Sequence, residues 1–153
     1  MEHIFLKQLN KNFLLLFISM AVGIIAIGCE ENKTVQCEQI FQIARSVAES
    51  YQDISYAKGV ESLEMKRWLQ AASQLDSAAK NIKALNIDNS QLIQYQNQLA
   101  TVYRIYSQAT YDAVRARENK NLAALESARS DANKAGKMQQ NLIQEINAFC
   151  LDY

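Results

Sequence analysis

Residues that break helices are almost absent from this chain. It has no proline, and only Gly59 and Gly136 occur after residue 28. Proline and glycine are the residues that most often interrupt helices, so a chain without them is expected to form long ones. Apolar residues also recur every three or four positions, which is the period of an amphipathic helix. The sequence therefore predicts an all-α fold with few connections.

The apolar spacing predicts four helices in residues 34–153. The first covers about 34–58 and ends at Gly59, the second about 61–85, the third runs to about 117, and the fourth carries 125–149. Turn-forming residues at 86–90 separate the second from the third, with Asp88 as the expected N-cap and Gln91 completing a capping box. Residues expected on the buried faces are Ile40, Val47, Tyr51, Met65, Trp68, Leu69, Leu75, Ile82, Leu92, Tyr95, Leu99, Tyr103, Tyr106, Ala128, Ala135, Met138, Leu142 and Ile146.

Two arrangements of these helices are consistent with the pattern. Similar lengths and short connections favour an up-down-up-down four-helix bundle. Residues 118–121 are the weakest break, because they contain neither glycine nor proline. In the alternative, the third and fourth helices form one helix of about 60 residues that must dimerise to cover its apolar stripe.

The first 28 residues resemble a secretory signal peptide. Lys7 and Lys11 precede an apolar run over residues 13–27, which is followed by Gly28 and Cys29. This run is shorter than the ~20 residues that a membrane-spanning helix usually needs. A small residue before a cysteine is typical of bacterial lipoprotein signals, in which the cysteine becomes diacylated after cleavage. An uncleaved anchor and ordinary secretion are the alternatives, and both also export the rest of the chain.

This interpretation divides the chain into three parts. Residues 1–28 are the signal peptide, 29–33 are a tether attached to the membrane through lipidated Cys29, and 34–153 are the four-helix bundle. The bundle is then expected outside the cytoplasm, on the periplasmic or lumenal side of a bacterial membrane.

Composition excludes several classes of function for the exported part. Residues 29–153 carry 14 of the 16 Lys plus Arg and 15 of the 16 Asp plus Glu, without a basic run, which argues against nucleic-acid binding. The only histidine, His3, lies in the signal segment. Without imidazole the usual hydrolytic relays, zinc sites and di-iron bundles cannot form. We expect no enzyme activity, no cofactor and no metal site.

Cys37 and Cys150 stand at the beginning of the first predicted helix and near the end of the fourth. In the up-down-up-down bundle these two points lie at the same end, and an oxidising compartment permits a disulfide between them. The alternative is two buried thiols that never meet. Redox activity is disfavoured, because the pair lacks the close spacing that lowers a thiol pKa. We expect a structural bond that stabilises the bundle.

Several tyrosines fall on the predicted core faces. Tyr51, Tyr103 and Tyr106 could line a pocket for an aromatic or apolar ligand, with their hydroxyls fixing its orientation. The favoured alternative is packing, in which these rings fit opposite a row of alanines in the fourth helix. Trp68 is in phase with the second helix's stripe and is likewise expected in the core.

Four blocks of sequence resemble an uncharacterised family of small exported helical proteins of cyanobacteria. The blocks are residues 37–40 (CEQI), 68–88 (WLQAASQLDSAAKNIKALNID), 92–96 (LIQYQ) and 146–150 (INAFC). The resemblance implies paired terminal cysteines and a membrane-attached bundle, and it brings no activity.

These observations predict a non-enzymatic, membrane-anchored lipoprotein that acts as a scaffold or protein-interaction module. The alternative is an extracytoplasmic, sensor-like domain that binds a small ligand. We expect an unknown protein partner for the first, and a ligand among the tyrosines for the second.

Overall fold

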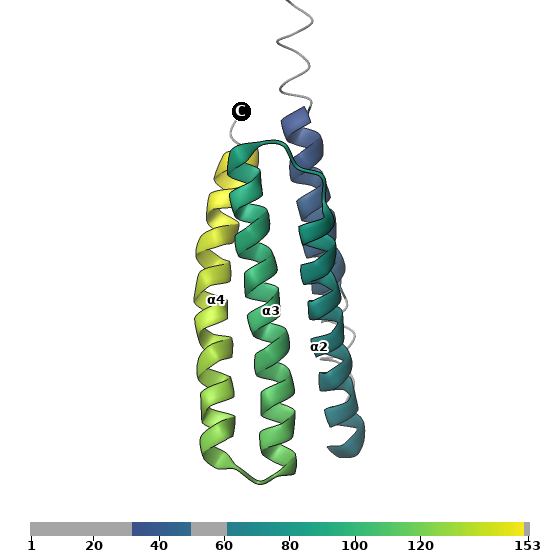
Figure 1. Ribbon diagram of the computed structural model, residues 1–153, viewed down its shortest axis with the longest axis vertical. Coiled ribbons are helices and arrows are strands. Elements are labelled where there is room, and N and C mark those ends of the chain that lie inside the picture. The colour runs from purple at the N-terminus through teal and green to yellow at the C-terminus, as the bar shows by residue number, and fades with distance from the viewer. Residues whose placement is uncertain (1–31, 50–60, 152–153) are drawn as a thin grey trace, which may run out of the picture. The chain divides into compact units, whose positions relative to one another are not determined.

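The computed structural model describes residues 32–49 and 61–151 of the 153. They form a helix over residues 32–49, followed by α2 (Glu61–Ala84), α3 (Ser90–Glu118) and α4 (Leu122–Leu151) (Figure 1). No strand occurs in these two ranges. The four predicted helices and the all-α class are confirmed. Cys29, Tyr51 and Gly59 lie outside the described residues.

The chain divides into two units, Met1–Val35 and Gln36–Tyr153. Of the first unit only residues 32–35 are described, and they are helical. In the second unit α3 packs against both α2 and α4, and the three run antiparallel in sequence order (Figure 1). A disulfide joins Cys37 to Cys150, which places the start of the N-terminal helix beside the end of α4. The second unit is therefore a helical bundle whose first and last helices are covalently joined.

The connection between α3 and α4 ends α3 without glycine or proline. Lys120 adopts a left-handed conformation with φ 51°. The Lys120 N–H donates to the Arg117 carbonyl at 3.0 Å, and the Asn121 N–H donates to the Ala116 carbonyl at 2.8 Å. This pair of bonds is a Schellman motif, which normally has glycine in the left-handed position. The chain reverses here, so the alternative of one continuous helix of about 60 residues is wrong.

Asn121 directly precedes α4 and caps its first turn. Its side-chain oxygen accepts a hydrogen bond from the Ala124 N–H at 3.1 Å, which satisfies one of the free donors of the first turn. The break that looked weakest in the sequence thus carries a helix-ending motif and a helix-starting cap in four residues.

The N-cap of α3 is Asn89, whereas the sequence predicted Asp88. The Asn89 side chain accepts hydrogen bonds from the N–H groups of Gln91 and Leu92, at 3.0 and 3.1 Å. Asp88 is not available for this role, because its carboxylate accepts a hydrogen bond from the Gln36 side chain. The prediction placed the cap one residue too early because it ignored contacts with the N-terminal helix.

The core contains most of the residues that the apolar pattern predicted. Its largest fully buried side chains are Ile40, Ile82, Leu92 and Val102, one or more from each of the first three helices. Leu142, Ile146 and Cys150 bring α4 into the same cluster. Three predicted core residues are instead exposed, namely Trp68, Leu69 and Met138. Met138 lies three residues after the buried Ala135 and four before the buried Leu142, which places it at the edge of the buried face of α4.

Within the two described ranges, no helix combines the length and the apolar character needed to cross a membrane.

Candidate functional sites

The disulfide end of the bundle is held by side chains buried around the two cysteines. Cys37 and Cys150 are both buried, and their Cα atoms are 6.0 Å apart. Edge-to-face packing of Tyr95 against Phe149, with ring centroids 5.9 Å apart, joins the start of α3 to the end of α4 beside them. The bond therefore links two helix ends that already pack against the same core.

Gln36, next to Cys37, binds the connection between α2 and α3. Its side-chain oxygen accepts from the N–H groups of Asp88 and Asn89, at 3.1 and 3.2 Å. Its amide nitrogen donates to the Asp88 carboxylate. Only 4% of Gln36 is exposed, so these bonds are shielded from competing water. A single glutamine thus satisfies two backbone donors just before α3 begins.

Gln96 performs the corresponding task for the end of α2. Its side-chain nitrogen donates to the carbonyls of Ile82 and Leu85, at 2.7 and 2.9 Å. The Ile82 carbonyl also accepts from the Leu85 N–H at 3.2 Å, and Leu85 directly follows the last residue of α2. Gln96 therefore adds a side-chain donor where the helix runs out of backbone donors. The burial of these two glutamines was not predicted from the sequence. A hydrophobicity pattern assigns every glutamine to the surface, whether or not its amide is buried.

Two of the three tyrosines predicted to line a ligand pocket lie together on one pocket of the bundle. Tyr103 and Tyr106 line a pocket of about 250 Å³ together with Gln139 and small or apolar residues of the N-terminal helix and α2, which are Ala44, Val47, Ala48 and Leu75. We call this the tyrosine pocket. Tyr51, the third predicted member, lies outside the described residues. The pocket is bounded by all four helices.

Burial changes the acidity of both tyrosines. Removal from water raises the pKa of Tyr103 to about 12, and the neighbouring Tyr106 adds to the rise. Burial also raises the pKa of Tyr106 above its ordinary value. Both hydroxyls therefore stay protonated at neutral pH and can donate a hydrogen bond, which suits a neutral acceptor more than a proton-transfer role.

Gly136 on α4 lies directly opposite Tyr106. A Cβ atom at this position would be 3.1 Å from the Tyr106 hydroxyl oxygen, closer than ordinary van der Waals contact. The glycine therefore gives the tyrosine room to point across the bundle. The sequence predicted that the tyrosines pack opposite a row of alanines in the fourth helix, and this contact with a glycine was not part of that prediction.

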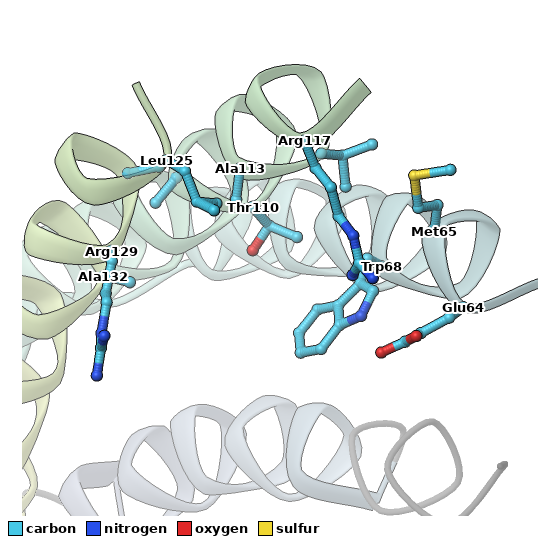
Figure 2. Close-up of a pocket in the computed structure, with 12 residues that line it drawn as sticks. Glu64, Met65, Trp68, Thr110, Ala113, Arg117, Leu125, Arg129 and Ala132 are labelled. Carbon is cyan, nitrogen blue, oxygen red and sulfur yellow. The ribbon is translucent and has the colours of Figure 1, made fainter. Parts of the chain in front are cut away.

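A second pocket, of about 280 Å³, lies near the α3–α4 turn, and we call it the distal pocket (Figure 2). Its apolar lining comes from α2, α3 and α4, and consists of Met65, Trp68, Ala109, Ala113, Val114, Leu125, Ala128 and Ala132. Its polar lining is Glu64, Thr110, Arg117 and Arg129. No helix other than these three contributes a lining residue that the structure describes.

Trp68, which lines the distal pocket, was predicted to lie in the core, and this prediction is wrong. It precedes the buried Leu75 by seven residues, about two helical turns, and so points the same way. Even so, 41% of Trp68 is exposed. The indole faces the inside of the bundle but borders the pocket, because the residues opposite it on α3 and α4 are mostly alanines.

Among the described residues, no cluster of three or more His, Cys, Asp or Glu side chains has the arrangement of a metal site. Cys29, the predicted lipidation site, lies outside the described ranges.

No protein-family model, curated protein or solved structure matches this chain.

Proposed function

We propose that this protein is a non-enzymatic lipoprotein, anchored through diacylated Cys29 to the outer side of a bacterial membrane. Its bundle then serves as a scaffold or interaction module for another protein. The observation that carries the proposal is the Cys37–Cys150 bond. Disulfides persist in oxidising compartments outside the cytoplasm, which is where the signal-like first 28 residues would direct the chain.

The disulfide also supports an orientation for the bundle. Only seven residues separate Cys29 from Cys37, and those from 32 onward are helical, so the tether spans at most about 20 Å. The 29 residues of α3 extend about 43 Å from the disulfide end. In this proposal the α3–α4 turn faces away from the membrane, where a partner from solution would meet it.

Leu122 is the exposed apolar residue best placed for such a contact. It is the first residue of α4, directly after the turn, and 68% of it is exposed. A single exposed leucine is ordinary on a protein surface, so it supplies a position to probe and not an interface by itself.

Anchoring is tested by metabolic labelling with an alkyne analogue of palmitate, followed by membrane fractionation. The wild-type chain should be labelled and recovered with membranes, whereas Cys29→Ser should lose the label. Cys37→Ser with Cys150→Ser is the matched control, because it removes two other cysteines and should keep the label. Equal labelling of the wild type and Cys29→Ser would contradict the lipoprotein assignment.

The interaction role is tested with a photo-crosslinking amino acid at position 122 in native membranes. A control crosslinker goes at position 148, which is also exposed but lies at the disulfide end. One reproducible protein adduct from position 122, and none from position 148, would support the proposed orientation and role. Absence of adducts, with a small molecule co-purifying instead, would favour the second candidate.

The second candidate is binding of a small neutral ligand, and the tyrosine pocket is the observation that favours it. Tyr103, Tyr106 and Gln139 line about 250 Å³ together with small and apolar side chains. A ligand that fills this space should raise the melting temperature of the wild type, since it binds only the folded state. It should stabilise Tyr106→Phe less, because that variant lacks one hydroxyl.

A further inference from the structure

We propose that the distal pocket binds a small amphipathic carboxylate, with its charged group at Arg129 and its apolar body against Trp68. This inference goes beyond both candidate functions, since neither uses these residues, and it does not depend on the lipid anchor. It rests on the shape of the pocket, on the position of Trp68 and on the arrangement of charges around the lining.

The lining of the pocket suits an apolar body of modest size. Alanines from α3 and α4 form much of the surface, and they leave about 280 Å³ between the helices. Ligand pockets commonly begin near 300 Å³ and are mostly apolar with a few polar groups that set orientation. A short alkyl chain fits this description better than a large or strongly polar molecule.

Trp68 gives the pocket its largest apolar surface. The indole faces inward by its helical phase, yet 41% of the residue remains exposed. A ligand chain lying along it would remove that apolar surface from water at roughly 25 cal/mol per Å². Met65 also lines the pocket, and its flexible side chain can adjust to the end of the ligand's alkyl chain.

The charges give the pocket a direction. Arg129 lies at the opposite end from Glu64 and Trp68 (Figure 2). A carboxylate near Glu64 would be repelled by its like charge, whereas one near Arg129 would be attracted. The ligand therefore places its head group at Arg129 and its tail toward Trp68.

Arg129 has the chemistry for that head group. It is exposed, and it makes no hydrogen bond or ion pair with any residue in the described ranges. A guanidinium binds a carboxylate through two parallel hydrogen bonds, which a lysine cannot reproduce. Arg117 is the other arginine of the lining, but its side chain extends toward Trp68, at the end of the pocket that also holds Glu64 (Figure 2). Its charge is therefore offset by the Glu64 carboxylate, and Arg129 is the positive group at the opposite end.

Trp68 is the only tryptophan in the protein, so its fluorescence reports on this pocket alone. The experiment uses the full chain in nanodiscs of phosphatidylcholine and titrates octanoate, octanamide and octylammonium. These probes share an alkyl chain and differ in charge. Octanoate should shift Trp68 emission to the blue and saturate, with affinity about tenfold above that of octanamide. Octylammonium should give no saturable shift.

Variants of Arg129 test the head-group contact. Arg129→Gln should weaken octanoate binding about tenfold and leave octanamide unchanged, with Arg129→Lys in between. Arg104→Gln, an exposed arginine of α3 that does not line the pocket, should bind octanoate like the wild type. Loss of fold would not produce this ranking. The Cys29→Ser chain should bind equally, which separates ligand binding from membrane anchoring.

Three results would overturn the proposal. Equal affinity for octanoate and octanamide would show that charge plays no part. Unchanged octanoate binding by Arg129→Gln would remove the head-group site. Trp68 emission that is already blue-shifted in the free protein, and unaffected by octanoate, would show that the chain itself occupies the pocket.

Discussion

Gly136 and Tyr106 illustrate a balance between helix propensity and packing at a single contact. Glycine inside a helix costs about 1 kcal/mol relative to alanine. Here that cost is offset by the room the glycine leaves for the Tyr106 hydroxyl, 3.1 Å from where a Cβ would lie. Position 136 therefore favours glycine because any larger side chain would crowd Tyr106 of α3.

Gly136→Ala alone should change the free energy of unfolding little, because the gain in propensity is offset by crowding against Tyr106. In the Tyr106→Phe background, the same substitution should stabilise the protein by about 0.5–1 kcal/mol. Urea unfolding of the four proteins in this double-mutant cycle measures the coupling. The same stabilisation in both backgrounds would show that the hydroxyl does not crowd position 136.

Tyr103 predicts a loss of stability at alkaline pH. Its pKa is raised to about 12 in the folded protein, whereas a tyrosine in the unfolded chain titrates near 10. The folded state holds the Tyr103 proton more tightly than the unfolded chain does. The contribution of Tyr103 to the free energy of unfolding is therefore fully present below about pH 10 and is lost as the pH rises through about 12. The loss is at most about 2–3 kcal/mol.

Denaturant unfolding from about pH 9 to about pH 12 measures this loss. Tyr103→Phe should flatten the alkaline decline, whereas Tyr111→Phe, at a half-buried site of α3, should keep it. A decline of equal size in both variants would assign it to other groups.

At the scale of the elements, Gln36 joins the N-terminal helix to the α2–α3 connection through hydrogen bonds. Gln36→Ala removes the acceptor for two buried N–H groups and should lower the free energy of unfolding by about 1–3 kcal/mol. Gln42→Ala, exposed on the same helix, should change it by less than about 0.5 kcal/mol. Thermal and urea unfolding provide the comparison, and similar small effects would mean that water replaces Gln36.

In the α3–α4 turn, by contrast, we expect a substitution that raises the free energy of unfolding. Lys120 occupies a left-handed position that suits glycine, so Lys120→Gly should stabilise the protein by about 0.5–1 kcal/mol. The matched control is Lys137→Gly inside α4, which should destabilise it by about 1 kcal/mol. Destabilisation by both substitutions, measured by urea unfolding, would show that Lys120 carries no strain.

The helices could be predicted from the sequence because they depend on local periodicity, which the chain displays clearly. α2 and α3 end within about two residues of the expected positions. The cysteine pairing followed from the same topology. The Asn89 cap, the two buried glutamines and the exposure of Trp68 could not be predicted, because each depends on a side chain from another helix.

At the scale of the whole molecule, the disulfide closes a loop with a sequence separation of 113 residues. Chain entropy alone assigns such a loop about 4–5 kcal/mol, a large part of the 5–15 kcal/mol typical of a domain. Replacing both cysteines with alanine should therefore lower the free energy of unfolding by about 3–5 kcal/mol.

Reductant offers an independent check on this value. Reducing the wild-type protein should lower its midpoint of unfolding close to that of the double-alanine variant. The variant itself should not respond to reductant. A wild-type protein that unfolds at the same denaturant concentration with and without reductant would contradict a stabilising role for the bond.

The covalent link between the first and last helices also has a mechanical consequence. A pull applied ahead of Cys37 and resisted beyond Cys150 passes through the sulfur–sulfur bond, so none of the intervening chain can be drawn out. Stretched in this way, the oxidised protein should lengthen by only a few residues' worth of backbone, whereas the reduced protein should unravel helix by helix. The bond makes the bundle a rigid link under tension.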